Sequence, residues 1–234
     1  DGHGLPREDV FSYTAPGAPF YDHEWLTDLV FASLFSVGGS AALVVLKLLL
    51  SAIMLVAMLD ATRSTVACLT PDERPHPLTI AAVLIASLAV IAPGATFRPQ
   101  LFTMVFLALE VAMLLRADRR LESGSTVPAQ LAAMPPMMLA WANLHGGFLV
   151  GLGLLGVWCA THIVTSFVQR LRGVAADLEP QQMIAVACVG LLSLAAPLIN
   201  PYGIHLYTYL ADTLDMHGEI SEWFPVTLLT TEFL

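Results

Sequence analysis

The chain has 234 residues, of which 56% are hydrophobic and only 12% are charged, and its mean hydropathy is +0.72. Soluble domains carry roughly 25% charged residues, so a water-soluble fold of this length could not hide so much apolar surface. Lipid is the alternative solvent, in which helices satisfy their own backbone hydrogen bonds. A formal net charge of −9, with ten scattered Lys and Arg residues, argues against a nucleic-acid partner.

The N-terminal part is predicted to lie outside the membrane. Residues 1–23 are polar and rich in Gly and Pro, which indicates a loop. Residues 24–37 carry apolar side chains near one helical face, with two acidic residues in the first turn, where the helix dipole favours negative charge. This segment is shorter than the ~20 residues of a membrane crossing. We therefore expect an interfacial helix that ends at Gly38-Gly39.

Six later segments are apolar enough to cross a membrane, which predicts an all-α, polytopic transmembrane bundle. They are residues 40–62, 78–95, 99–116, 128–144, 147–168 and 182–198. Pro135-Pro136 should kink or shorten the fourth. A second interfacial helix is expected at 203–214. The predicted organisation is an outer loop with its helix (1–39), a six-span bundle (40–198) and an outer C-terminal segment (199–234).

The Lys and Arg residues predict the orientation of this bundle. Alternate loops carry seven of the ten: Arg63, Arg74, Arg116, Arg119, Arg120, Arg170 and Arg172. The other loops carry only Arg7 and Arg98, and Lys47 lies within a span. Positive charge is concentrated in the cytoplasmic loops of membrane proteins, so the arginine-rich loops should be cytoplasmic. The N-terminal loop, residues 93–99, residues 143–147 and the C-terminal stretch should then face outward.

Candidate functional residues gather on that outer face. In Asp22-His23-Glu24-Trp25, a carboxylate could be a general base, a metal ligand or a helix N-cap. Arg98 stands at a span boundary on the side where arginine is disfavoured. Its fork of donors suits a phosphate group, and snorkelling to a lipid phosphate is the alternative.

Two further outer turns carry polar side chains beside the membrane. The stretch Trp141 to Gly147 ends a span with Asn143, His145 and two glycines, which permit tight turns and the close approach of a ligand. Asn143 and His145 could bond a sugar or a phosphate, or the stretch could be a plain turn between helices. Asn200-Pro-Tyr-Gly203, followed by His205, is ordinary turn chemistry on its own.

Familiar cofactor signatures are absent from the sequence. It has no phosphate-binding GxxxxGK[ST] loop, no GxGxxG, no HExxH and no GxSxG, so ATP hydrolysis, nicotinamide chemistry and zincin proteolysis have no support. The three cysteines lie apart in apolar runs. Acids near His23 could hold a divalent cation, but no ligand spacing requires one. We expect neither a metal site nor a cofactor.

Two charged residues, Lys47 and Glu110, lie inside predicted spans. Charges within a membrane usually face protein or water and often pair. An ion pair between Lys47 and Glu110 is therefore a hypothesis of the sequence.

Six stretches of the chain form a recognisable set: Asp9 to Gly17, Asp22 to Leu26, Arg98-Pro-Gln100, Trp141 to Phe148, Asn200 to Gly203 and Ile220-Ser-Glu-Trp223. Together they resemble a group of bacterial multi-spanning membrane proteins associated with the GT-C superfamily of polyprenyl-phosphate-dependent glycosyltransferases. The resemblance covers most of the chain. It implies an all-helical membrane module whose long first outer loop bears juxtamembrane helices and an acidic catalytic base.

Matched residue by residue, the resemblance implies Asp9, Asp22 or Glu24 as the loop acid. Arg98 and His145 are implied for the donor phosphate. The other predicted substrate-binding residues lie in or beside the same motifs: Gln100, Asn143, Asn200, Tyr202, His205 and Glu222. Related sequences usually carry an acid and paired tryptophans upstream of this loop, after a first span. The chain begins downstream of that point, and we expect it to be a segment of a longer polypeptide.

The function predicted from these residues is transfer of a sugar from a polyprenyl-phosphate donor to an acceptor on the outer face of the bacterial cytoplasmic membrane. Its partners would be membrane lipids and the lipid-linked donor. The alternative is a non-catalytic accessory subunit of a larger membrane complex. A transporter ranks last, because only Lys47 and Glu110 suggest a polar path across the membrane.

Overall fold

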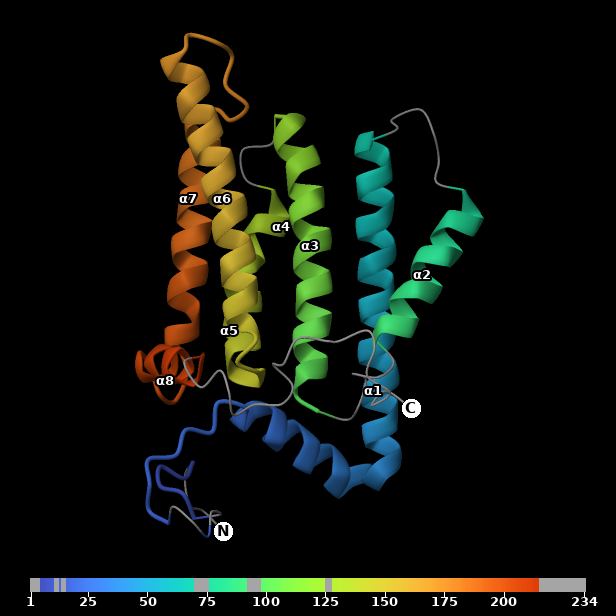
Figure 1. Cartoon of the computed structure of the whole chain (residues 1–234), viewed down its shortest axis with the longest axis vertical. Coiled ribbons are helices and arrows are strands. Elements are labelled where there is room, and N and C mark those ends of the chain that lie inside the picture. The colour runs from blue at the N-terminus through green and yellow to red at the C-terminus, as the bar shows by residue number, and fades with distance from the viewer. Residues whose placement is uncertain are drawn as a thin grey trace, which may run out of the picture.

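The computed structural model describes residues 5–10, 13, 16–69, 76–91, 98–124 and 128–214. Over these residues the fold is all-helical, and the only β-type pairing is an isolated bridge between Glu8 and Pro19. The helices run up and down side by side, except for two that lie across the lower end of the bundle (Figure 1). The coarse prediction of a helical bundle is confirmed.

Helix α1 (Trp25–Leu69) is bent into two arms at Gly39, which has φ 58° and ψ −151°. Only glycine adopts such a backbone conformation at little cost. The first arm lies across the lower end of the bundle, and the second rises along α3 (Figure 1). The predicted interfacial helix and the first predicted span are therefore two arms of one bent helix.

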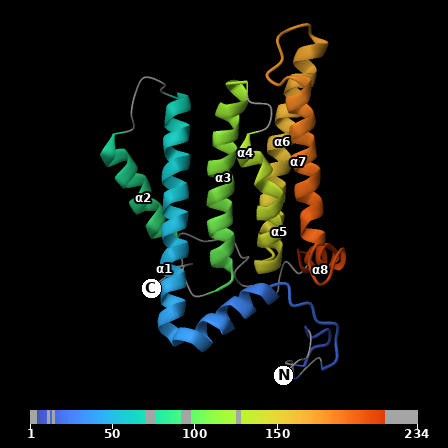
Figure 2. The same ribbon diagram turned by 180° about the vertical axis from the view of Figure 1, so that it is seen from behind.

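Helix α3 (Gln100–Glu122) stands in the middle of the bundle. On one side it packs against the upper arm of α1, beside which α2 (Pro77–Ile91) runs at a slant. On the other side lie α5, α6 and α7, and the view from behind shows the same order (Figure 2). The first and last residues of α3 therefore lie at opposite ends of the bundle.

The fourth predicted span is broken into two short helices, α4 (Ala129–Ala132) and α5 (Met134–Leu144). Pro135 and Pro136 stand in the first turn of α5, where a proline lacks no helical hydrogen bond. The prediction that Pro135-Pro136 kinks or shortens the fourth segment is thus confirmed, and the helix breaks just before the pair. Short α5 is the most enclosed helix, and its Met134, Met138 and Trp141 are fully buried.

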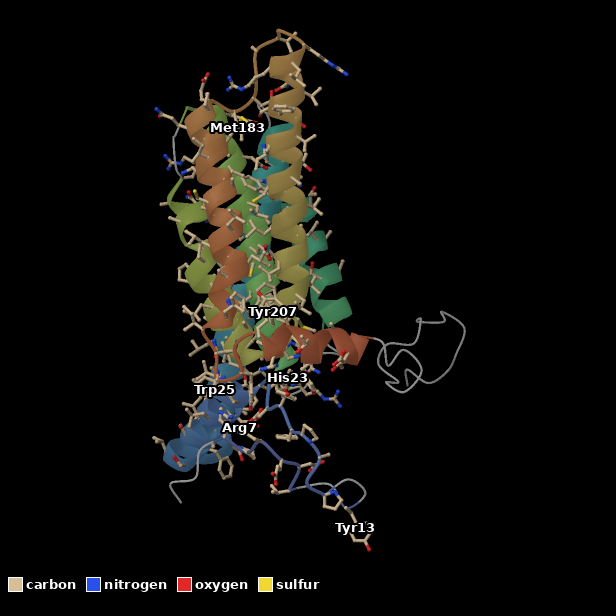
Figure 3. The ribbon with its side chains drawn as sticks, turned by 90° about the vertical axis from the view of Figure 1, so that its left-hand side faces the viewer. Arg7, Tyr13, His23, Trp25, Met183 and Tyr207 are labelled. Carbon is tan, nitrogen blue, oxygen red and sulfur yellow. The ribbon has the colours of Figure 1, made fainter. Side chains whose placement is uncertain are left out.

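The last helices are α6 (Phe148–Leu171), α7 (Pro180–Ala195) with a 3-10 turn at Ala196–Leu198, and α8 (His205–Leu214). Helix α7 starts with Pro180 in its first turn, and the backbone N–H of Glu179 donates to Gln182 Oε1 (2.8 Å). Helix α8 lies across the lower end, as predicted for the segment 203–214 (Figure 3).

In the described part of the chain, four helices are long and apolar enough to cross a membrane. They are Trp25–Val66, Gln100–Glu122, Phe148–Leu171 and Pro180–Leu198. Many of their large apolar side chains point away from the protein, among them Leu48, Val157 and Leu191. Such a surface suits lipid contact. The chain is therefore a helical membrane protein in its coarse architecture.

The two ends of the bundle differ in charge. The ends of α1, α3 and α6 that carry Arg63, Arg116, Arg119, Arg120, Arg170 and Arg172 all lie at the top of Figure 1. We call this the arginine end. Arg7 and Arg98 belong to the opposite end, where the segment before α1, the start of α3, the α5–α6 turn and the segment before α8 meet. We call this second end the site end.

Candidate functional site

The centre of the site end is a contact between Glu24 and His145. Glu24 directly precedes α1, and His145 is the first residue after α5. Glu24 Oε1 lies 3.2 Å from His145 Nε2 and 3.6 Å from His23 Nε2. About a quarter of the Glu24 side chain is exposed (26%), so the carboxylate can be reached from outside. Residues 121 positions apart thus form one acid–imidazole group.

The proton of the His145 ring is located by its other contacts. His145 Nδ1 lies 2.8 Å from the backbone N–H of Gly147, which donates to it, and 2.8 Å from Thr103 Oγ1. An accepting Nδ1 has no proton, so in the neutral ring the proton is on Nε2. Nε2 is the ring nitrogen that lies 3.2 Å from Glu24 Oε1. The arrangement therefore places the protonated nitrogen of His145 beside the carboxylate.

The network continues into the bundle through Thr103 on α3. Its Oγ1 accepts the indole N–H of Trp141 (2.9 Å), so the hydroxyl proton is available for His145 Nδ1. Trp141 is fully buried and stacks on Phe106 at 5.5 Å between ring centroids. The core of the bundle therefore fixes the orientation of His145, and through it the orientation of Glu24.

Burial shifts the protonation equilibria of this group. It raises the pKa of Glu24 to about 7, and the nearby carboxylates of Asp28 and Asp22 add to the rise. It lowers the pKa of His145 to about 4, with a further contribution from His23. Burial likewise lowers the pKa of His23. At neutral pH the imidazoles are uncharged, and Glu24 exchanges a proton in the range that suits a general base.

A second set of bonds fastens the first arm of α1 to the bundle. The indole N–H of Trp25 donates to Asn143 Oδ1 (3.0 Å), and the Thr27 hydroxyl donates to the backbone oxygen of Leu144 (2.6 Å). The amide nitrogen of Asn143 donates to the backbone oxygens of Leu139 (2.8 Å) and Ile199 (3.2 Å). Asn143 is buried and uses its whole side-chain amide on protein partners.

Asp22 and Tyr202 close the other side of the cluster. The backbone N–H of Asp22 donates to the Tyr202 hydroxyl (3.0 Å), and Asp22 Oδ1 accepts the N–H of Glu24 (3.3 Å). The second bond joins residues two apart in the turn before α1. Asn200 Oδ1 in turn accepts the N–H of Tyr202 (2.7 Å). The side chains of Asp22 and Asn200 thus bond backbone N–H groups and hold the main chain in place around the site.

The two glycines of the α5–α6 turn are required by close packing. A Cβ on Gly147 would collide with Thr103 and would lie 2.9 Å from His145 Nδ1. A Cβ on Gly146 would lie 3.0 Å from Leu210 and 3.3 Å from the His23 ring. Neither glycine has a positive φ, so packing against the protein's own side chains explains both.

The structure brings together five of the predicted site residues: Asp22, Glu24, Asn143, His145 and Tyr202. Asn200 joins them through Tyr202. Asp9 lies in the turn before α1, where its backbone bonds Gly17 and Ala18, and Arg98 and Gln100 are exposed at the start of α3. His205 is exposed on α8. None of these four is a partner of Glu24 or His145, and Glu222 lies outside the described residues.

Three residues of the network were not in the predicted set: Thr103, Trp141 and Trp25. Thr103 is a single hydroxyl in an apolar helix, which from sequence is indistinguishable from a lipid-facing or self-bonded threonine. Trp25 and Trp141 stand inside the stretches that signalled the site, so their place in the motifs was the available signal. Their indole N–H groups need partners when buried, and Asn143 and Thr103 supply them.

Deeper in the bundle, Glu110 is fully buried on α3, and neither of its carboxyl oxygens has a hydrogen-bond partner within the described residues. Its carboxylate and the Trp141 ring lie where a Cβ on residue 151 would be, so Gly151 leaves room for both. Lys47 forms no ion pair with it, so that hypothesis was wrong. The reason is burial: Glu110 faces the side of α5 and α6, whereas Lys47 lies on α1 across the middle helix.

Over the described residues, no group of three or more His, Cys, Asp or Glu side chains is arranged to hold a metal ion. Comparisons with protein-family models, with curated proteins and with solved structures find no match for this chain. The geometry of the site end is therefore the basis for inferring a function for this chain.

Proposed function

We propose that this chain is a GT-C-like membrane glycosyltransferase in which Glu24 is the general base. The observation that carries the proposal is the Glu24–His145 contact: a reachable carboxylate with a pKa of about 7, held in place by a neutral imidazole at one end of a membrane bundle. General bases work best when their pKa lies near the operating pH. A lipid-linked sugar would present its head group at this end.

In the proposed reaction Glu24 takes the proton of an acceptor hydroxyl. The hydroxyl oxygen forms a bond to the anomeric carbon of the donor sugar, and the bond from that carbon to the polyprenyl-phosphate oxygen breaks. The phosphate leaves with the bonding electron pair. Arg98, exposed at the start of α3, is proposed to bind this phosphate with Gln100. His145 lies against Glu24, so we assign it to positioning the base rather than to the phosphate.

The proposed topology is six crossings, as in the resemblance to GT-C enzymes. Besides the four long helices, α2 and the α4–α5 pair alternate in direction with their neighbours (Figure 1). The arginine end would be cytoplasmic and the site end periplasmic in a bacterial cytoplasmic membrane. That orientation would place Glu24 where undecaprenyl-phosphate sugars display their head groups for transfer to periplasmic acceptors.

The test is an assay of polyprenyl-phosphate release from undecaprenyl-phosphate-linked sugars by the purified protein in lipid vesicles. Glu24→Gln should lower the rate by about 100-fold or more, since general bases contribute 10²–10⁴. Glu8→Gln is the matched control, because Glu8 is an exposed acid of the same outer segment without a contact to His145. Full activity of Glu24→Gln, or of Asp22→Asn with Glu24→Gln, would remove these acids from catalysis.

The alternative proposal is an accessory subunit that has kept the fold. The bonds of Trp25 and Thr27 are compatible with this role, because they fasten the first arm of α1 to the bundle without any contribution from Glu24. If the protein releases no lipid phosphate, binds no lipid-linked sugar and is always isolated with stoichiometric partners, the accessory role holds and the enzyme proposal fails.

A further inference from the structure

A second feature stands at the arginine end, on the face of the last two turns of α3 that points away from α6. A cavity of about 530 Å³ is lined there by Arg116, Arg119, Arg120, Ser123 and Gln130. The first four positions have the i, i+3, i+4, i+7 spacing of one helical face. Arginines that end a helix also interact with its dipole, but the dipole does not require them to share one side.

The acidic residues of the same two turns are on a different face. Asp118 and Glu122 line a separate cavity of about 500 Å³ with His162 of α6. Asp118 Oδ1 is bonded there by the indole N–H of Trp158 (2.9 Å) and by His162 Nε2 (2.9 Å). Among the described residues, no carboxylate lines the arginine cavity. In a chain of net charge −9, this separation concentrates positive charge on one small concave surface.

The arginines are held from behind by α1. Arg116 Nε lies 2.7 Å from Asp60 Oδ2, an ion pair rather than an aligned hydrogen bond, because that oxygen has no hydrogen-bond donor in line with it. Arg119 donates from one terminal nitrogen to Ser64 Oγ (2.8 Å). These contacts orient two guanidinium groups and use only part of their five donors each. Arg116, Arg119 and Arg120 are all exposed.

An apolar groove of about 340 Å³ adjoins the arginine cavity. It runs between α1 and α3 and is lined by apolar side chains such as Leu49, Ile53, Val56 and Met113, and at its end by Asp60 and Arg116. Arg116 is therefore common to the groove and to the cavity. The groove lies on helices long enough to cross a membrane, so it opens where acyl chains would lie.

We propose that this face binds an anionic phospholipid, with its phosphate in the arginine cavity and one acyl chain in the groove. Guanidinium forks match phosphate oxygens in geometry and charge, and basic pockets between membrane helices suit anionic head groups. Charge complementarity selects the head group, and the apolar lining selects a lipid over a free phosphate. The site is separate from the site end and does not depend on the proposed glycosyltransferase function.

The test is lipid retention by the purified full chain. The protein in neutral detergent is offered equal amounts of phosphatidylglycerol and phosphatidylcholine, and bound lipid is counted by native mass spectrometry. We expect phosphatidylglycerol to be retained preferentially. Arg119→Gln with Arg120→Gln should weaken its retention about 25-fold, from about fivefold per arginine. Ala52→Trp, which fills the groove at an exposed position of α1, should also weaken it.

The matched control is Arg172→Gln, which removes one exposed arginine at the same end but outside the cavity. It should leave retention unchanged, and inorganic phosphate at millimolar concentration should not displace the lipid. Equal retention of both lipids, an equal loss with Arg172→Gln, or displacement by inorganic phosphate would overturn the proposal. Thermal melts of each variant show that it is folded, so that a loss of lipid is not a loss of structure.

Discussion

The two ends of this bundle hold their polar groups in opposite ways. At the site end, Glu24, His145, Thr103 and Trp141 are joined in a half-buried network whose donors and acceptors are largely spent on one another. At the arginine end, exposed guanidinium groups face a cavity and are only partly engaged by α1. The comparison teaches that the first end encloses a carboxylate whose pKa is raised by burial, whereas the second leaves guanidinium groups exposed beside a cavity.

The largest expected effect on stability follows from cutting the network at its fastening point. Asn143→Leu leaves the indole N–H of Trp25 and the backbone oxygen of Ile199 without partners, which should cost about 2–6 kcal/mol, given 1–3 per unsatisfied group. Denaturation of the detergent-solubilised protein measures it. Arg119→Gln at the other end should cost far less, and equal losses at both ends would contradict the difference.

A smaller loss is expected from crowding the α5–α6 turn. Gly147→Ala forces its Cβ against Thr103 beside His145, which should cost about 1–3 kcal/mol, as overpacking does. Gly153→Ala is the control on α6, because a Cβ there meets no atom within 4 Å and alanine favours the helix. The melting temperature should fall for the first variant and stay or rise for the second. The reverse order would refute the close packing around His145.

The pH dependence of stability should distinguish the two ends further. Because the pKa of Glu24 is raised from 4.5 to about 7, its contribution to stability is lost as pH rises from about 4.5 to 7. The pKa of His145 is lowered from 6.5 to about 4, so its contribution is gained as pH rises from about 4 to 6.5. The two effects oppose each other in the natural chain.

Glu24→Gln removes the falling contribution and leaves the rising one. The melting temperature of this variant, relative to the natural chain, should therefore increase as pH goes from about 4.5 to 7. Glu8→Gln should leave the difference flat, since Glu8 is exposed and outside the network. A flat difference for Glu24→Gln as well would mean that burial does not perturb this carboxylate.

The smallest effect is expected from an exposed ion pair at the arginine end. Arg170 lies 3.9 Å from Glu179, whose side chain is 80% exposed. Such pairs are typically worth less than about 1 kcal/mol and are screened by salt. Glu179→Gln should therefore change the melting temperature little, and 0.5 M salt should erase the change. A loss as large as that of Asn143→Leu would show that charge pairs also stabilise the arginine end.

Much of the architecture was predictable from the sequence. Long apolar runs need lipid or a core, so the membrane class and the helices at 99–116, 147–168 and 182–198 follow from composition alone. Their predicted ends lie within three residues of those observed, except that α3 continues six residues beyond 116. Pro135-Pro136 and Gly38-Gly39 marked real breaks, because proline and glycine restrict or free the backbone locally. Charge bias likewise predicted which loops share an end.

Only the tertiary structure decided which polar residues meet. The sequence gathered candidates at one end of the bundle by counting crossings, but that count has no resolution within a face, so Glu24 could not be separated from Asp9 or Asp22. The choice came from packing: Trp141, through Thr103, and Gly147 fix the His145 ring, and its Nε2 lies against Glu24. Periodicity and composition report the solvent around a helix, whereas a contact between residues 121 positions apart depends on how helices are brought together.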